Sequence, residues 1–192
     1  MIDRHRPILT IGYGNRTIDE LLSLLERQDV QFVGDVRTSP YSRFAPDFSR
    51  EALKTHLARV GIRYVFMGDT LGGNPDDESV RVGDKSGQRH YVVYEKVKEL
   101  PSFQAGVNRL FNAWRDNVGL ALLCSEAKPE ACHRVRLIGV ALDNTPVQIM
   151  HIDENDELRT QEEIMLRLDK GQASLPGIGN SAKSAKSSKA FG

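Results

Sequence analysis

The chain has 192 residues, of which 40% are hydrophobic and 27% are charged, and this composition suits one α/β domain with a buried core. Lysine and arginine together number 26, as do aspartate and glutamate, so the net charge gives no support for nucleic-acid binding. Two cysteines do not make a disulfide framework, and no apolar run reaches the roughly 20 residues that span a bilayer. The first residues also lack the apolar core of a signal peptide. We therefore expect a cytoplasmic protein without membrane association.

The first predicted unit is a strand over 8–13 followed by a helix. Thr17 and Glu20 have the spacing of a capping box, in which each side chain bonds the other residue's backbone amide. The glycine-containing turn before them lies at a helix N-terminus, a geometry that presents backbone donors to an anion. Gly12 and Tyr13 in this turn are therefore candidate ligand-binding residues.

A second strand is predicted over 31–36, and a loop rich in hydroxyls and cations follows it. Asp35 and Arg37 lie two residues apart, so on an extended chain they project to the same face. With Ser39 and Arg43 they form a second candidate ligand loop. The alternative is that Asp35 simply pairs with Arg37 or caps a turn.

Helical signals follow this loop. Ser49 is a good N-cap residue, and Phe48 with Leu53 fits a hydrophobic staple. Gly61 supplies the left-handed residue that commonly ends a helix. A third strand is then predicted over 62–66.

Residues 67–90 contain five glycines and one proline, which argues against regular structure. Long loops inside compact domains are usually functional, so we interpret this segment as a flap over the site. Gly72 and Gly73 would serve as a hinge or a close backbone approach. The alternative is a plain surface excursion. Two helices are predicted next, over 91–100 and from Pro101 onward.

Both cysteines lie in one connection between a buried strand at 120–123 and an apolar helical pattern. Its polar residues combine a nucleophile, an acid–base group, a cation and a carboxylate: Cys124, Ser125, Glu126, Cys132, His133 and Arg134. We place the helix start between residues 129 and 132, so Cys132 falls in the first turn. The helix dipole, His133 and Arg134 would stabilise its thiolate there, which makes Cys132 the candidate nucleophile, and Glu126 would orient it or act as base.

Other roles for these residues stay open. Cys124, at the tip of a buried strand, resembles the thiolate position of phosphatase loops, but nine residues rather than five separate it from Arg134. It could equally be a small buried residue, or form a redox pair with Cys132. A zinc site would need a fourth ligand beyond Cys124, Cys132 and His133, and none is evident, so we predict no metal. Arg134 could pair with Glu126 or Asp35 instead of binding a ligand.

A last, peripheral strand is predicted over 146–152, followed by an acidic turn over 153–157 and a helix from Thr160. From 171 onward glycine, serine, alanine and lysine dominate without apolar periodicity. We therefore predict a single α/β domain over 1–170 and a disordered tail over 171–192.

Strands that alternate with helices predict a three-layer sandwich with a mainly parallel central sheet and helices on both faces. The polar segments all follow strands, so they should meet at the carboxyl edge of the sheet, where such folds bind ligands. The arginines in these segments favour a phosphate- or carboxylate-bearing ligand. The candidate ligand-binding residues are Gly12, Tyr13, Asp35, Arg37, Ser39, Arg43, Gly72, Gly73, Cys124, Ser125 and Arg134.

Five motifs occur in order over residues 8–152: Thr10-Ile11-Gly12, Asp35-Val36-Arg37, Gly61-Ile62, Leu71-Gly72-Gly73, and Leu123-Cys124-Ser125-Glu126 with Cys132-His133-Arg134. In combination they resemble the domain-of-unknown-function 488 family. The resemblance implies an α/β domain and brings no established activity. The family more often has Gly-His-Ser where this chain has Gly12-Tyr13-Gly14, so no role of that histidine or serine carries over.

The leading hypothesis is an enzyme-like domain that binds a small anionic, phosphate- or nucleotide-like ligand. Arg37, Arg43 and Arg134 would hold the anion, and Cys132 or His133 would do covalent or acid–base work. The alternative is a non-catalytic binding or regulatory module with structural cysteine and arginine, whose basic tail contacts nucleic acid or a partner. The sequence identifies neither a cofactor nor an oligomeric state.

Overall fold

The computed structural model describes residues 5–83 and 90–173. Its centre is a six-stranded sheet with the order β3-β2-β6-β1-β7-β8, in which only the edge strand β8 runs antiparallel to its neighbour. The strands are β1 (Ile8–Gly12), β2 (Phe32–Asp35), β3 (Arg63–Phe66), β6 (Leu120–Cys124), β7 (Ile149–Ile152) and β8 (Leu158–Thr160).

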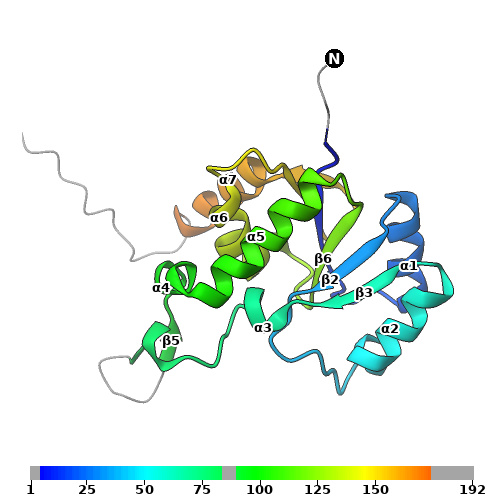
Figure 1. The fold of residues 1–192 in the computed structure, drawn as a ribbon, viewed down its shortest axis with the longest axis horizontal. Helices are drawn as coiled ribbons and strands as arrows, with labels where there is room; N and C mark the ends of the chain where they lie inside the picture. The colour runs from blue at the N-terminus through cyan, green and yellow to red at the C-terminus, as the bar shows by residue number, and fades with distance from the viewer. Residues whose placement is uncertain (1–4, 84–89, 174–192) are drawn as a thin grey trace, which may run out of the picture.

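Helices cover both faces of this sheet, which confirms the predicted three-layer α/β fold (Figure 1). One face packs against α1 (Ile18–Arg27) and α2 (Arg50–Arg59). The other packs against α3 (Gly68–Leu71), α4 (Tyr94–Glu99), α5 (Pro101–Arg115), the π-helix η4 (Arg134–Gly139) and α6 (Val140–Leu142). Strand β6 serves both cores, because Ala121 and Leu123 face the first and Leu122 faces the second.

The order of the strands creates a crevice at the end of β6. Strand β6 lies between β2 and β1. The chain passes from β1 to α1 and from β2 to α2, and both helices lie on the same face of the sheet. After β6 it passes instead to η4 on the opposite face. Loops that diverge in this way leave space at the carboxyl end of the strands, which is where ligands bind in open α/β sheets.

Local signals in the sequence are mostly confirmed. Thr17 and Glu20 form the predicted capping box at the start of α1. Gly61 has a φ of +76°, which is the left-handed conformation predicted after α2. Ser49 does lie at the N-cap of α2, which follows the 3-10 helix η1 (Pro46–Phe48), but its hydroxyl donates to the Ser42 carbonyl instead of capping the helix.

The prediction of an irregular segment over 67–90 is wrong in part. It contains α3, a short 3-10 helix η2 (Glu78–Val80) and strand β4 (Arg81–Gly83), which pairs with β5 (His90–Val92) in a two-stranded sheet. Because β5 uses residues predicted as helix, α4 begins at Tyr94 rather than at 91. Residues 84–89 lie outside the described residues, and the flap role stays a prediction.

The C-terminal strand prediction also needs correction. Strand β7 is not peripheral, since β8 pairs with it and takes the sheet edge. The last helix, α7 (Gln161–Ala173), continues past residue 171, where the tail was predicted to begin. The rest of the predicted tail, 174–192, lies outside the described residues. Within the described part of the chain, no helix is long and apolar enough to cross a membrane.

Candidate functional site

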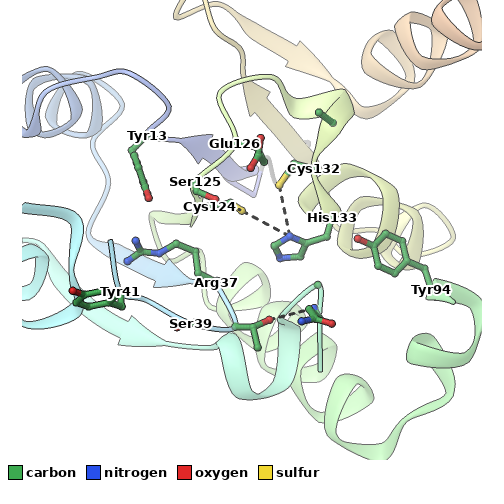
Figure 2. A pocket seen from close by; sticks show the side chains of 14 residues that line it. Tyr13, Arg37, Ser39, Tyr41, Tyr94, Cys124, Ser125, Glu126, Cys132 and His133 are labelled. Atoms are coloured by element: carbon green, nitrogen blue, oxygen red, sulfur yellow. Dashed lines mark hydrogen bonds between the residues drawn. The ribbon is translucent and has the colours of Figure 1, made fainter. Parts of the chain in front are cut away.

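A pocket of about 390 Å³ lies at the carboxyl end of β6, where the loops after β1 and β2 also meet (Figure 2). This position agrees with the convergence predicted from the sequence. The predicted site residues that line the pocket are Tyr13, Arg37, Ser39, Gly73, Cys124, Ser125, Glu126, Cys132 and His133. The predicted residues that do not line it are Gly12, Asp35, Arg43, Gly72 and Arg134.

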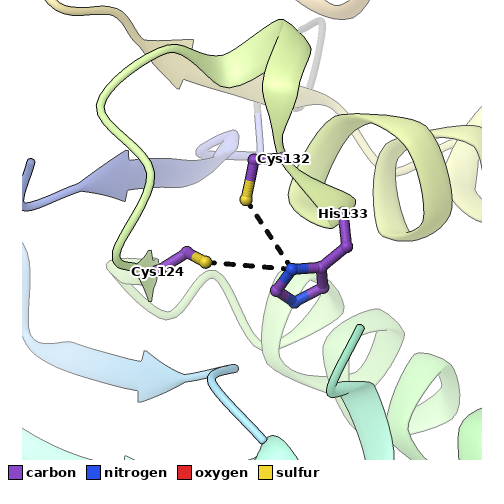
Figure 3. A group of neighbouring side chains, drawn as sticks. All are labelled: Cys124, Cys132 and His133. Atoms are coloured by element: carbon purple, nitrogen blue, oxygen red, sulfur yellow. Dashed lines mark hydrogen bonds between the residues drawn. The ribbon is translucent and has the colours of Figure 1, made fainter. Parts of the chain in front are cut away.

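The two cysteines and His133 form a cluster on one wall of the pocket (Figure 3). Cys124 ends β6, and its Sγ lies 3.8 Å from His133 Nδ1. Cys132 Sγ lies 3.6 Å from the same nitrogen. Both cysteines are free and buried, with 5% and 2% of their surface exposed. Residues distant from each other in the connection therefore meet around one imidazole nitrogen.

The hydrogen bond of His133 Nε2 determines which hydrogen-bonding role Nδ1 can take. His133 Nε2 lies 3.1 Å from the carbonyl oxygen of Val36, the residue directly after β2. A carbonyl can only accept, so Nε2 carries the hydrogen and donates it. Nδ1, which faces the two sulfurs, can then accept a hydrogen from a thiol when the ring is neutral and donate one to a thiolate when the ring is charged.

The cluster shifts the pKa values of the two thiols in opposite directions. A hydrogen bond from the Cys132 thiol, followed by interactions with His133, lowers the pKa of Cys124 to about 3 despite its burial. Donating that hydrogen bond, together with burial, raises the pKa of Cys132. The arrangement therefore favours Cys124 as the thiolate, although the sequence pattern favoured Cys132.

The reason given for a Cys132 thiolate is confirmed only in part. Cys132 does not lie in the first turn of a helix, because its backbone is extended, with φ −114° and ψ 148°. A 3-10 turn, η3 (Pro129–Ala131), precedes it, and η4 begins two residues later at Arg134. The Cys132 carbonyl nevertheless accepts from the Val135 and Arg136 amides, so Cys132 lies at the N-terminus of the helical segment and remains within reach of its dipole.

Arg37 forms the ion pair that was the alternative prediction for it. Its Nε and Nη2 donate to the two carboxylate oxygens of Asp35 at 2.8 and 2.6 Å. Tyr64 also donates to Asp35, which is fully buried. Arg37 Nη1 has no hydrogen-bond partner within the described part of the chain. The guanidinium lies 5.4 Å from the ring centroid of Tyr13, at the pocket wall (Figure 2).

Arg134 holds the loop rather than reaching the pocket. It is fully buried, and its Nη2 donates to the carbonyls of Glu126 at 2.7 Å and Ala127 at 2.9 Å. Its partners are therefore backbone oxygens, not the carboxylates of Glu126 or Asp35 predicted as alternatives. Burial lowers the pKa of Arg134, although both nearby cysteines act to raise it.

Glycines allow the loops to approach one another this closely. A Cβ on Gly12 would lie 1.7 Å from the Glu126 carbonyl oxygen, so Gly12 lies beneath the loop that Arg134 holds. A Cβ on Gly73 would lie 2.6 Å from Cγ of the His133 ring. Gly72 packs similarly against Thr38. The close backbone approach predicted for the Gly72–Gly73 pair is what the structure has.

The other predicted anion contacts lie elsewhere. Arg43 is exposed and packs over the Phe44 ring, outside the pocket. Arg16, in the turn before α1, is also unavailable to a ligand in the pocket, because it binds Asp156 and backbone carbonyls of the loops nearby. The N-terminus of α1 is occupied by its own capping box. Of the first predicted ligand loop, only Tyr13 lines the pocket.

Several lining residues were not predicted: Thr38, Tyr41, Asn74, Tyr94 and Ala131. Tyr94 was assigned to the interior of a helix, and the hairpin that places it at the helix start has no clear sequence signal. Thr38 and Asn74 are next in sequence to the predicted residues Arg37 and Gly73, so a prediction that covered these loops in full would have included them.

The comparisons with known proteins leave the activity open. Neither the curated proteins nor the solved structures contain a match to the chain. The sequence does match a family described as Domain of unknown function DUF488, over residues 17–141. This match spans more than half of the chain and includes the Cys124–Arg134 connection. The chain therefore belongs to the DUF488 family, as its sequence motifs predicted.

Proposed function

We propose that the chain is an enzyme that binds a small anionic, phosphate- or nucleotide-like ligand in the pocket, with the cysteine–histidine cluster as its reactive centre. The observation that carries the proposal is Arg37. Arg37 lines the pocket, is only 6% exposed as a residue, and has an Nη1 without a partner among the described residues. A buried charged donor without an acceptor is costly, and an anion oxygen would supply the acceptor.

The surroundings of Arg37 support this ligand class. Hydroxyl groups of Ser39 and Ser125 are available on the same lining. The volume of about 390 Å³ falls within the range of small-molecule pockets. Glu126 is exposed at the pocket, and we retain it as the group that would orient a ligand or act as base.

The second candidate is a non-catalytic binding or regulatory module, possible partners including nucleic acid. Arg134 favours it, since its charge is used inside the fold on backbone carbonyls. The neutral net charge of the chain gives no support for the nucleic-acid version. Alkylation distinguishes the two candidates. Cysteines that react only after unfolding would support the module, and a cysteine that reacts in the folded protein supports the enzyme.

Binding is tested with the full chain and a panel of phosphate, pyrophosphate and nucleotides, by thermal shift and calorimetry. Removing Arg37 alone would leave Asp35 as an unpaired buried charge, so the test variant is the double change Asp35→Asn with Arg37→Gln. Ser125→Ala is a milder second variant. Arg43→Gln is the matched control, because it removes a positive charge from the same loop outside the pocket.

We expect at least one anion to stabilise the native chain and the Arg43→Gln control equally. Both pocket variants should lose most of this stabilisation while keeping a cooperative melt. A native chain that none of these anions stabilises, or a double variant that binds as well as the native chain, would refute the proposal.

The location we propose is the cytoplasm. Both cysteines of the chain are free, and a reactive centre built on thiols needs a reducing compartment.

A further inference from the structure

The separations within the cysteine–histidine cluster have the dimensions of a metal site. Cys124 Sγ, Cys132 Sγ and His133 Nδ1 all lie within 4.8 Å of one another. Tetrahedral zinc has Zn–S bonds of about 2.3 Å and Zn–N bonds of about 2.0–2.1 Å, which puts sulfur and nitrogen ligands about 3.5–3.6 Å apart. The two sulfur–nitrogen distances here are 3.8 and 3.6 Å. Both sulfur–nitrogen distances are therefore within a few tenths of an ångström of those in a zinc site, and the two sulfurs, which lie within 4.8 Å of each other, are near enough for one ion to bind both.

We propose that Cys124, Cys132 and His133 bind one zinc ion through their two sulfurs and Nδ1. Thiolate and imidazole are the ligand types that zinc prefers in proteins. The sequence suggested no metal because a fourth ligand was missing. A zinc site that performs chemistry has three protein ligands and keeps its fourth position open, so the missing ligand does not count against this kind of site.

His133 is already oriented as a metal ligand. Histidines that bind metals usually donate their other ring hydrogen to a carboxylate or a backbone carbonyl, which fixes the tautomer and the ring direction. His133 Nε2 donates to the Val36 carbonyl in this way. Gly73 lies against the same ring, so the imidazole has a fixed support on that side as well.

Arg134 holds the two sulfur-bearing parts of the connection together. Its backbone follows directly after Cys132 and His133, while its side chain binds the carbonyls of Glu126 and Ala127, two and three residues after Cys124. This contact closes the loop between the two cysteines. The buried guanidinium also places a positive charge near both sulfurs, which offsets the charge of a second thiolate.

The fourth position would face the pocket, because all three ligand residues line it together with Arg37 and Ser125. Its occupant would be water or an oxygen of the anionic ligand, and the ion would act as a Lewis acid on that oxygen. The identity of this occupant rests on the proposed function, whereas zinc binding itself does not.

The test uses the full chain, stripped with a chelator under reducing conditions and titrated with Co²⁺ as a spectroscopic substitute for zinc. We expect one equivalent to bind, with the absorption of tetrahedral cobalt and a sulfur-to-cobalt charge-transfer band, and Zn²⁺ should displace it. Cys124→Ser and His133→Gln should each abolish tight binding. His56→Gln, on α2 and outside the pocket, is the control and should bind like the native chain.

A variant that replaces one metal-binding side chain with another controls for loss of binding caused by unfolding. Cys132→His keeps three ligands, so it should still bind cobalt, with a charge-transfer band reduced from two thiolates to one. Circular dichroism verifies the fold of each variant. A folded native chain that binds no cobalt would overturn the proposal, as would folded Cys124→Ser and His133→Gln variants that each still bind one equivalent.

Adding phosphate to the cobalt-loaded chain separates this inference from the proposed function. A cobalt spectrum that forms but does not respond to any anion of the panel supports the metal site and counts against the anionic ligand. Anion-dependent stabilisation of a chain that binds no metal would support the anionic ligand and refute the metal site.

Discussion

Gly12 offers a direct test of how the site is held, because its substitution perturbs the loop without removing any polar group. A Cβ at this position would lie 1.7 Å from the Glu126 carbonyl oxygen and 2.9 Å from Arg134 Nη2. The oxygen belongs to backbone and itself accepts the Arg134 bond at 2.7 Å, so it cannot move without loosening that contact. Gly12→Ala must therefore displace the end of β1 or the loop after β6.

The expected cost combines two effects. Forced overpacking typically costs about 1–3 kcal/mol, and weakening a hydrogen bond from a charged donor adds about 1.5–3 kcal/mol. We expect a loss of about 3–5 kcal/mol in the free energy of unfolding. For a domain of this size, each kcal/mol lowers Tm by about 2–4 °C, so Tm should fall by about 6–20 °C.

Gly61→Ala is the matched control for this measurement. Gly61 has a φ of +76°, but a Cβ there would meet nothing within 4 Å. Its replacement should therefore cost only the left-handed backbone penalty of about 1–2 kcal/mol. Urea and thermal unfolding of both variants give the comparison. If Gly12→Ala is no less stable than Gly61→Ala, the loop after β6 does not pack tightly against the end of β1.

Three further predictions follow from buried polar groups and from Gly73. Burial, opposed by the hydrogen bond to Gln161, lowers the pKa of His151 to about 4, so below pH 6.5, its ordinary pKa, the folded protein binds fewer protons than the unfolded chain. The contribution of His151 to the free energy of unfolding should therefore be full above about pH 6.5 and fall by about 3 kcal/mol toward pH 4. Urea unfolding of His151→Gln should show a flatter pH profile than that of the native chain. Asp35→Asn alone should cost about 3–5 kcal/mol by leaving Arg37 unpaired, more than the double change Asp35→Asn with Arg37→Gln, and equal losses in chemical denaturation would contradict this account of the pair. Gly73→Ala should displace the His133 ring and weaken cobalt binding by about tenfold or more in a competitive titration, with a loss of stability of about 1–3 kcal/mol, and unchanged cobalt affinity would show that Gly73 does not support the ring.

Much of the fold could be predicted because its signals are local. The apolar run before Cys124 indicated a strand buried on both faces, and β6 is central in the sheet. The Thr17–Glu20 pair correctly marked the start of α1. The positions that failed are short elements that have too few residues to show a strand pattern. Strands β4 and β8 have three residues each, and β4 lies in a glycine-rich segment that resembles a loop.

The roles of the arginines could not be predicted, because position in the chain does not tell whether a long side chain points outward or inward. Arg37, Arg43 and Arg134 were all expected to hold the anion, yet they occupy a pocket wall, open solvent and the fold interior. The direction of the Arg134 side chain depends on the irregular backbone that precedes it. That backbone makes contacts with distant segments, such as the bond from Gln161 Nε2 to the Val135 carbonyl, and periodicity does not report such contacts.

The same irregular backbone explains how consecutive residues serve different purposes at the site. In a regular helix, successive side chains diverge by about 100°, which would turn His133 away from Cys132. Here Cys132 is extended between a 3-10 turn and a π-helix, and its Sγ lies 3.6 Å from the His133 ring while Arg134 points into the loop. The π-helix is itself tied down, because Gln161 Nε2 donates to the Val135 carbonyl. The chemistry of the site is thus set by a departure from regular structure, and a change that regularised this connection would separate Cys132 from His133 while leaving the sheet intact.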